Sequence, residues 1–273
     1  MNIRIAAVLS LALFSGGALA ASDAAPRKFA VMSLIGDSLT VVTSRATIGS
    51  HLDRNDVQTF DDPSAALDTV ALHATEEAIR KVDAGAAPIL LATDSPELRK
   101  LQGQLVDSQH LVDADGLVGE LKKAGVTDFL LITKHRAPTA LQAREETLGS
   151  GTLYGVGFYI DKDKIIRRSD TEQVATGYLA PYAYFEISLV DVGTLAVQKQ
   201  ASVTAGVVLS NARNQSDSDP NPWNVLSTAE KLKALDQLIR DNIMKSVPGM
   251  ILAGAPAGAA SSSPANAPSD AIP

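Results

Sequence analysis

The sequence predicts a single α+β domain, with an α/β-like first half, in which helices pack on a mixed β-sheet. Three patterns support this prediction. In the first half, short apolar runs alternate with amphipathic helical segments, as in strand–helix–strand units with parallel pairing. In the second half, alternating apolar and polar residues between turn residues indicate antiparallel strands. A capped amphipathic segment then adds a last helix.

The first two strands and the first helix are expected early in the chain. Residues 29–35 form a short apolar run and residues 39–43 are rich in β-branched side chains, so both segments are predicted strands. Asp62 offers an N-cap, and Pro63 suits the first position of a helix. Apolar residues then recur at helical spacing, which predicts an amphipathic helix that ends near Gly85.

Two more strands and two more helices complete the first half. Residues 87–93 are a predicted buried strand, and Ser95 is the expected N-cap of the helix that follows. Another helical segment covers residues 117–124 and stops at Gly125, because glycine readily adopts the left-handed conformation that ends a helix. Residues 126–133 are the next predicted strand.

The second half is predicted to be mainly antiparallel. Residues 153–160 and 182–209 have strand composition, and turn residues at 191–194 divide the longer stretch into two strands. A Ser-Thr-Ala-Glu capping box at residues 227–230 opens the last helix, whose leucines and isoleucines form one stripe. The sequence predicts that this helix ends at Pro248.

The two ends of the chain differ in composition from its centre. Residues 1–20 have a short basic start, an apolar run and a small-x-small ending, which predicts a signal peptide that is removed. The apolar run is shorter than the roughly 20 residues that span a bilayer, so a membrane anchor is the weaker alternative. Residues 253–273 are mostly Ala, Gly, Ser, Pro and Asn, so they are a predicted disordered tail. Residues 27–252 remain for the globular domain.

Composition narrows the compartment and the partners. The chain has no cysteine, which excludes disulfides, thiolate metal sites and a lipid-bearing cysteine. An export signal on an alanine-rich chain of this kind favours the periplasm, with the extracellular medium as the alternative. The net charge of −7 disfavours nucleic acid and anionic lipid as partners. The basic stretch at residues 162–168 is interpreted as a solvated hairpin end.

One resemblance concerns the order of elements. Four elements carry it: a helix that closes on Ala124-Gly125, the strand after it, a glycine-bearing strand, and the strand and turn at residues 185–194. In this order they resemble envelope proteins of the curli-secretion lipoprotein type and the N-terminal domain of the Tol-Pal propeller protein. The resemblance extends over roughly residues 60–245. It implies a non-catalytic binding or assembly part of the cell envelope. The chain lacks the lipid-bearing cysteine of that group, so lipid anchoring does not carry over.

A second resemblance is confined to four residues. Gly36-Asp37-Ser38-Leu39 resembles the first block of the secreted GDSL (SGNH-type) esterases and lipases, and it lies after the first strand, as in that family. The resemblance implies that Ser38 attacks an acyl carbonyl with the help of a histidine and an aspartate. The family carries its histidine near the C-terminal end, whereas no histidine follows His135 in this chain.

A different triad is possible on topological grounds. Ser38, Asp94 and His135 each follow a predicted strand, and active sites of open α/β sheets gather beyond the carboxyl ends of the strands. The alternative is that these are ordinary turn and cap residues. Two observations weaken the esterase hypothesis: residues 40–43 favour a strand where the family needs a helix, and Asn55-Asp56 follows too soon to be the family's Asn-Asp block.

Other candidate sites have weaker patterns. The glycines at 149–157 lack the Lys-Ser or Lys-Thr of a phosphate loop, so a bulge or close strand packing explains them better. His51 and Asp53 have no third ligand at metal spacing, and no metal or other cofactor is expected. The tyrosines between residues 154 and 184 are interpreted as packing on a half-buried sheet, with a groove lining as the alternative.

Together these patterns predict an exported, periplasmic protein with a binding or assembly role in the cell envelope and no catalysis of its own. The expected partner is an envelope protein or a small ligand. No integral membrane segment is expected after the signal peptide has been removed. The alternative function is a GDSL-type serine esterase or lipase that uses Ser38, with Asp94 and His135 as the remaining triad members.

Overall fold

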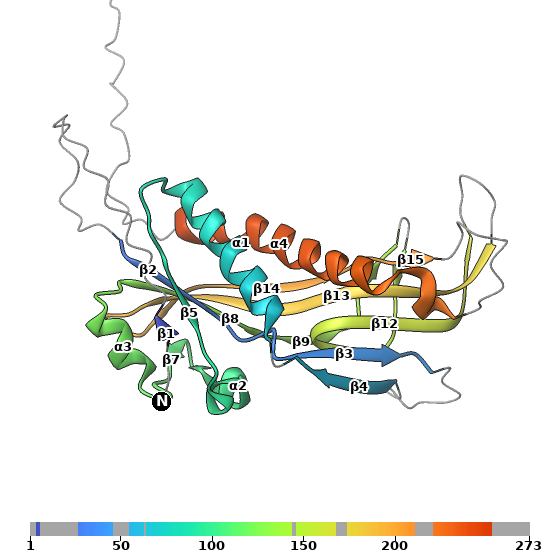
Figure 1. The fold of residues 1–273 in the computed structure, drawn as a ribbon, viewed down its shortest axis with the longest axis horizontal. Helices are drawn as coiled ribbons and strands as arrows, with labels where there is room; N and C mark the ends of the chain where they lie inside the picture. The colour runs from blue at the N-terminus through green and yellow to red at the C-terminus, as the bar shows by residue number, and fades with distance from the viewer. Residues whose placement is uncertain are drawn as a thin grey trace, which may run out of the picture.

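A mixed β-sheet runs the length of the computed structural model, which describes residues 4–5, 27–45, 55–62, 64–143, 146–167, 174–210 and 221–252 (Figure 1). The predicted tail and the predicted signal peptide, apart from residues 4 and 5, lie outside these ranges. The sheet contains eleven of the described strands: β1 (Arg4–Ile5), β2 (Phe29–Ser33), β3 (Ser38–Thr43), β4 (Asp56–Asp61), β5 (Ile89–Ala92), β8 (Asp128–Lys134), β9 (Arg136–Pro138), β12 (Thr152–Arg167), β13 (Val174–Asp191), β14 (Val197–Gly206) and β15 (Leu209–Ser210).

The remaining described elements are short hairpins and helices. The hairpins pair β6 (Val106–Asp107) with β7 (His110–Leu111) and β10 (Leu141–Gln142) with β11 (Thr147–Leu148). The helices are α1 (Ala66–Val82), α2 (Pro96–Leu101), α3 (Leu117–Lys123) and α4 (Thr228–Leu252), with 3₁₀ turns η1 (Gln102–Gln104) and η2 (Pro222–Val225).

The strand order is β1-β5-β2-β8-β13-β12-β3-β4, with β14 and β15 on β13 and β9 on β12. Parallel pairs join β2 to β5, β2 to β8 and β3 to β12, whereas β12, β13 and β14 form an antiparallel meander. The α+β class with a mixed sheet is therefore confirmed. Two of the three parallel pairs join strands of the α/β-like first half, and the third joins β3 to β12; the antiparallel meander occupies the second half, as predicted.

Strands β2 and β3 lie end to end. Strand β13 pairs with β12 over its first part and with β8 over its last part, so β12 and β8 lie along the same side of β13. Strand β3 pairs with β12, and β2 pairs with β8. The chain from Phe29 to Thr43 therefore follows one line, broken by a turn at Gly36 and Asp37 (Figure 1). Ser38 is the first residue of β3 and belongs to its pleat.

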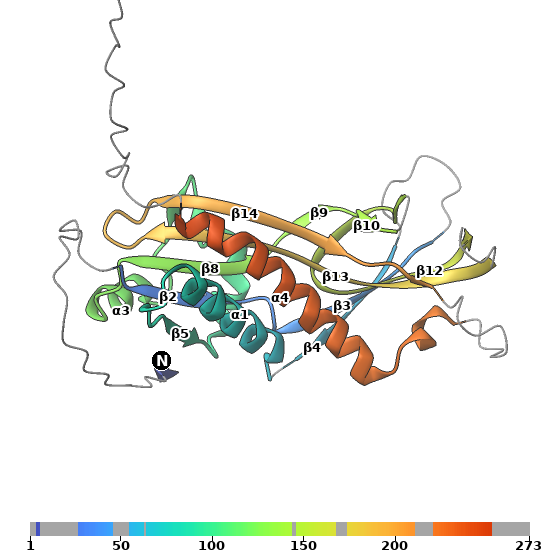
Figure 2. The same ribbon diagram turned by 90° about the horizontal axis from the view of Figure 1, so that it is seen from above.

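Helices α1 and α4 cover one face of the sheet (Figures 1 and 2). Leu235, Ile239, Ile243 and Val247 of α4 are fully buried, at the four-residue spacing of one helix face. They share a core with Ala71, Ala74 and Ala78 of α1, whose small side chains suit close packing, and with apolar residues of β8, β12 and β13. This core fixes where α1 begins relative to the bend between β2 and β3.

A second core lies on the opposite face, under α2, α3 and the β6–β7 hairpin. Ser95 caps α2, since its hydroxyl accepts the Leu98 amide, and Pro96 occupies the first turn, as predicted. Gly125 has a φ of +67° directly after α3, which confirms the expected left-handed helix end.

Four tyrosines form a third core. Tyr159, Tyr178, Tyr182 and Tyr184 are each at most 1% exposed and pack with leucines of β10 and β11. The hydroxyl groups of Tyr159, Tyr182 and Tyr184 have hydrogen-bond partners: the Tyr184 hydroxyl, for example, accepts the Ala140 amide at 2.9 Å. The packing interpretation of these tyrosines is therefore confirmed, although Tyr159 and Tyr178 also line a pocket of about 280 Å³ together with residues 146–150, Asp161 and Lys164.

Two helix ends differ from the prediction. Helix α1 begins at Ala66, because Asp62 accepts hydrogen bonds from the Ser64 amide and hydroxyl and so closes a turn before the helix; Pro63 lies outside the described residues. Helix α4 continues through Pro248 to Leu252. Met250 and Ile251 are buried in the core beyond the proline, and their burial offsets the backbone hydrogen bond that proline removes.

Candidate functional site

The hydroxyl of Ser38 is held by a lysine. Lys134, the last residue of β8, donates a hydrogen bond from Nζ to Ser38 Oγ at 2.6 Å and forms an ion pair with the Asp37 carboxylate. Only 6% of the Lys134 side chain is exposed. The lysine is thus a buried ammonium group that ties the bend before β3 to the end of β8.

Gly155 makes room for this lysine. Its φ is +68°, a conformation that residues with side chains rarely adopt, and a Cβ added there would lie 2.9 Å from Cδ of Lys134. The neighbouring Tyr154 is partly exposed, with the Arg136 guanidinium over its ring. Burial, and then the negative charge of Asp37, raise the pKa of Tyr154, so its hydroxyl stays protonated at neutral pH.

A buried carboxylate supports the same bend from the other side. Asp68, in the first turn of α1, accepts hydrogen bonds from the Ser33 hydroxyl at 2.7 Å, the Ile35 amide at 2.8 Å and the Gly36 amide at 2.9 Å. Its second oxygen accepts a hydrogen bond from Arg99 of α2 at 2.9 Å. One side chain therefore joins β2, α1 and α2.

Gly36 is required by this contact. A Cβ at position 36 would lie 2.4 Å from the backbone nitrogen of Asp68, which is closer than any real Cβ contact. The glycine of the Gly-Asp-Ser-Leu tetrapeptide thus allows α1 to approach the bend.

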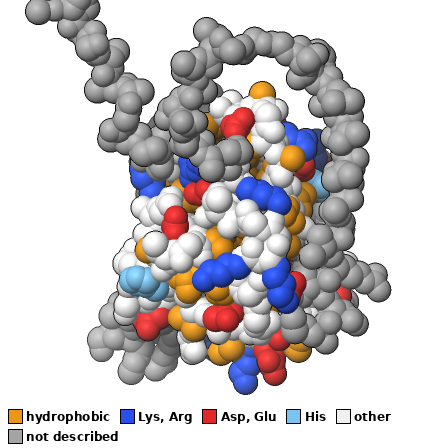
Figure 3. Space-filling view, turned by 90° about the vertical axis from the view of Figure 1, so that its left-hand side faces the viewer, with side chains coloured by type: hydrophobic (Ala, Val, Ile, Leu, Met, Phe, Trp, Pro, Cys, Tyr) orange, Lys and Arg blue, Asp and Glu red, His pale blue; other side chains and the backbone are white. Residues whose placement is uncertain are grey.

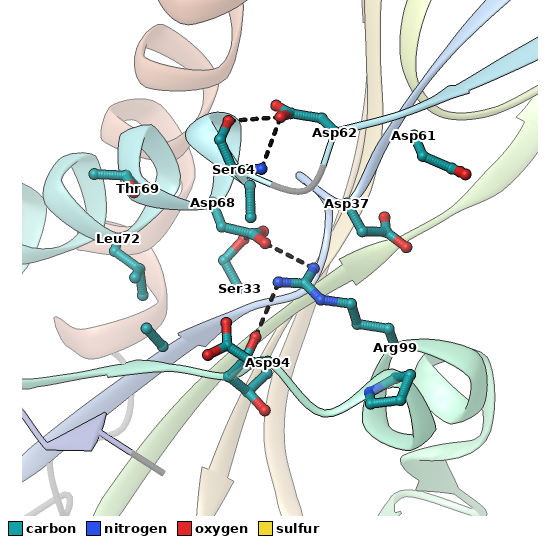
Figure 4. A pocket seen from close by; sticks show the side chains of 14 residues that line it. Ser33, Asp37, Asp61, Asp62, Ser64, Asp68, Thr69, Leu72, Asp94 and Arg99 are labelled. Carbon is teal, nitrogen blue, oxygen red and sulfur yellow. Dashed lines mark hydrogen bonds and ion pairs between the residues drawn. The ribbon is translucent and has the colours of Figure 1, made fainter. Parts of the chain in front are cut away.

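An acidic hollow of about 350 Å³ opens above this network (Figure 4). It lies between the bend after β2, the end of β4, the start of α1 and the connection from β5 to α2. Its charged lining residues are Asp37, Asp61, Asp62, Asp68, Asp94 and Arg99. Five carboxylates thus face one guanidinium, with the ammonium of Lys134 bound to Asp37.

The carboxylates of this hollow differ in their surroundings. The Ser64 hydroxyl, which donates to Asp62, lowers the pKa of that carboxyl. Asp37 and Asp68 have cationic partners in Lys134 and Arg99. Asp61 and Asp94 are exposed and make no ion pair with any residue that the structure describes. The hollow is therefore net negative.

The three predicted triad residues occupy different surroundings. Asp94 lines the hollow beside Asp37, but Ser38 and Asp94 share no hydrogen bond within the described ranges. His135 follows Lys134 directly in an extended segment, so the two side chains point to opposite faces. The His135 imidazole lies 3.9 Å from Glu186 Oε2, and His135 and Ser38 share no hydrogen bond among the described residues. The serine thus meets Lys134 in place of the histidine.

Two backbone donors near the serine are already occupied. Acyl transfer needs N–H groups aimed at the oxyanion of the intermediate. The amides of Ile35 and Gly36, on the bend before Ser38, donate to Asp68. The carboxylates around the hollow would also repel a developing negative charge.

No group of three His, Cys, Asp or Glu side chains within the described ranges is arranged to hold a metal ion, and His51 and Asp53 lie outside those ranges. None of the described helices is both long and apolar enough to cross a bilayer. On the end face drawn in Figure 3, basic side chains are interspersed with acidic and apolar ones.

Comparison with known proteins adds little. The sequence matches no protein-family model and no curated protein. Among solved structures, a DUF330 protein from Xanthomonas campestris is similar to the chain with a TM-score of 0.37 and 12% sequence identity, over 84% of this chain and 85% of that chain.

Sequence patterns did not identify Lys134, Asp68 or Arg99 as members of the site. Lys134 lies 96 residues from Ser38, and Arg99 lies 31 residues from Asp68. Strand alternation would only have separated Lys134, which shares the face of Ile132, from His135; it gives no sign that the Lys134 ammonium group reaches Ser38.

Proposed function

We propose that the chain is an exported protein of the cell envelope that acts by binding or assembly, without catalysis of its own. The observation that carries the proposal is that the groups a serine hydrolase needs around Ser38 are committed to aspartates. Lys134 is paired with Asp37, and the Ile35 and Gly36 amides are bonded to Asp68.

Each of these contacts opposes acyl transfer. The ion pair with Asp37 needs the charged form of Lys134, and a charged ammonium group cannot take a proton from the Ser38 hydroxyl. Amides that already donate to Asp68 do not point at an oxyanion. A nucleophilic serine would therefore lack its base, and these two amides would not serve as its oxyanion hole.

The alternative is a serine esterase that uses Ser38. The 2.6 Å contact between Ser38 Oγ and Lys134 Nζ favours this alternative, because serine–lysine pairs perform acyl transfer when the amine is neutral. Such an enzyme would use Lys134 in place of the predicted pair of Asp94 and His135.

Chemical labelling distinguishes the two functions. The purified chain and its Ser38→Ala variant are treated with a fluorophosphonate probe and assayed on a series of p-nitrophenyl esters. We expect no labelling and no turnover that depends on Ser38. Labelling of Ser38, or ester hydrolysis that the substitution abolishes, would overturn the non-catalytic proposal.

Export is tested in the same preparation. The full chain is produced in a Gram-negative host, and its periplasmic fraction is analysed by N-terminal sequencing. The predicted cleavage after Ala20 places Ala21 at the new terminus. An uncleaved protein that remains in the cytoplasm would contradict the envelope location.

A further inference from the structure

Strand β4 is an open edge of the sheet. It is the last strand in the order, and β3 is its only partner in the described part of the chain. All six of its residues are exposed; Val57 is 60% exposed and Phe60 is 54% exposed. An edge strand presents unpaired backbone groups that another chain can bind.

The hydrogen-bond pattern identifies the outward groups. The Asp62 amide donates to the Asp37 carbonyl at 2.7 Å, which makes these residues a hydrogen-bonded pair. Such pairs alternate along an antiparallel ladder. Phe60 and Gln58 therefore bond to β3, whereas Val57, Thr59 and Asp61 direct their N–H and C=O groups away from it.

The edge lacks two of the usual protections against pairing, although an aspartate lies at each of its ends. Strand β4 contains neither lysine nor proline, the residues that most often block an edge strand. Val57 lies opposite Val42 on one face, and Phe60 lies opposite Leu39 on the other, so apolar side chains are exposed on both faces of the strand.

The charge around the edge selects a partner. Strand β4 ends at Asp61, which lines the acidic hollow together with Asp62 and Asp94 (Figure 4). A strand added to β4 would extend past this hollow. A basic side chain on that strand would be attracted, whereas a second copy of this chain would bring further aspartates to the same edge.

We propose that β4 binds an extended segment of a partner protein, with apolar side chains in its centre and a lysine or arginine that lies over the acidic hollow. Main-chain hydrogen bonds to Val57, Thr59 and Asp61 supply affinity, and the carboxylates of Asp61 and Asp94 supply selectivity for a basic segment. The inference rests on the proposed binding function and names the class of partner.

The probe is a fluorescein-labelled peptide of alternating valine and threonine with a lysine at each end. The same peptide with glutamates at its ends is the matched control. Binding to the full chain is measured by fluorescence anisotropy at low salt, and the contact surface is mapped from amide shifts of ¹⁵N-labelled protein. We expect binding of the lysine peptide about tenfold tighter than that of the glutamate peptide, with shifts at residues 57–62.

Two kinds of substitution test the geometry. Thr59→Pro removes an outward N–H and keeps the ladder to β3, so it weakens peptide binding about tenfold, whereas Thr59→Ala leaves binding unchanged. Asp61→Asn with Asp94→Asn weakens binding of the lysine peptide about two- to fivefold per carboxylate, and binding of the glutamate peptide does not weaken. If the proline variant does not fold, the charge variant tests the inference.

Several outcomes would overturn the inference. These are equal binding of the two peptides, shifts that lie away from β4, unchanged affinity in both the folded proline variant and the charge variant, or a dimer whose interface is β4. None of these results depends on Ser38 labelling. If the peptide does not bind to β4 and Ser38 shows no activity, only the β4 inference fails and the proposed binding function stands. If Ser38 is active, the proposed binding function fails whether or not the peptide binds.

Discussion

Removing the carboxylate of Asp68 should destabilise the fold more than any other change in the hollow. In Asp68→Ala, the Arg99 guanidinium, the Ser33 hydroxyl and the amides of Ile35 and Gly36 lose their shared acceptor. Breaking a buried ion pair costs about 3–5 kcal/mol, and each buried donor left unpaired costs about 1–3 kcal/mol. Water from the hollow can reach some of these groups, so the costs do not add fully.

We therefore expect the free energy of unfolding to fall by about 3–5 kcal/mol. Urea unfolding followed by far-UV circular dichroism measures it: with a slope of about 2 kcal/mol per molar, the midpoint falls by about 2 M. Asp68→Asn keeps one acceptor oxygen but turns an amide towards Arg99, and we expect about half of this loss.

Asp94→Ala is the matched control. Asp94 lines the same hollow, is exposed and has no ion-pair partner in the described structure, so its loss should change the free energy of unfolding by less than about 0.5 kcal/mol. Equal midpoints for Asp68→Ala and Asp94→Ala would refute the view that Asp68 organises the bend.

Two further predictions concern packing and pH. Gly157→Ala should cost about 2–3 kcal/mol or more in urea unfolding, because its Cβ would lie 1.8 Å from the Thr40 carbonyl oxygen; Gly119→Ala in α3 meets no atom within 4 Å and should be neutral or stabilising by up to about 1 kcal/mol. An unaffected Gly157 variant would contradict the tight pairing of β12 with β3. Burial raises the pKa values of Tyr178, Tyr182 and Tyr184 above their ordinary value of 10, so these tyrosines stay protonated in the folded state after they have ionised in the unfolded chain. Stability is therefore complete below about pH 10 and falls above it, by up to about 1.4 kcal/mol per tyrosine and pH unit; an unfolding midpoint that is unchanged at about pH 11 would contradict this.

Local chemistry accounts for the elements that were predicted well. The capping box of α4 depends on residues three apart: the Ser227 amide donates to Glu230, whose amide donates to the Ser227 hydroxyl. The turn after β13 is similar, because Asp191 accepts the Thr194 amide and hydroxyl. Patterns of this range are complete within a few residues of sequence.

The candidate site depends on pairings that no local pattern contains. Which residue faces Ser38 follows from the order of β8, β12 and β13 and from the register of each pair. A shift of one residue along β8 would exchange Lys134 for His135. A histidine fits an esterase by its chemistry, but the adjacent lysine makes the contact with Ser38, because its long side chain reaches the bend from the end of β8.

The end of α4 illustrates a different kind of miss. Proline at position 248 predicts a helix end from backbone chemistry alone. The buried side chains of Val247, Met250 and Ile251 hold the last turns against the sheet, and this burial is a tertiary effect. Propensity is a weak guide where the core supplies several kcal/mol.

Each residue of the tetrapeptide Gly36-Asp37-Ser38-Leu39 has a structural role that requires no chemistry. Gly36 allows the close approach of Asp68, Asp37 pairs with Lys134, Ser38 accepts a hydrogen bond from the same lysine, and Leu39 packs against the core under α1 and α4. A four-residue match to an esterase motif is therefore accounted for by the bend between two collinear strands. The outward backbone groups of β4, and the carboxylates of Asp61 and Asp94, have no partner among the described residues. We therefore expect function at this sheet edge and not at the serine.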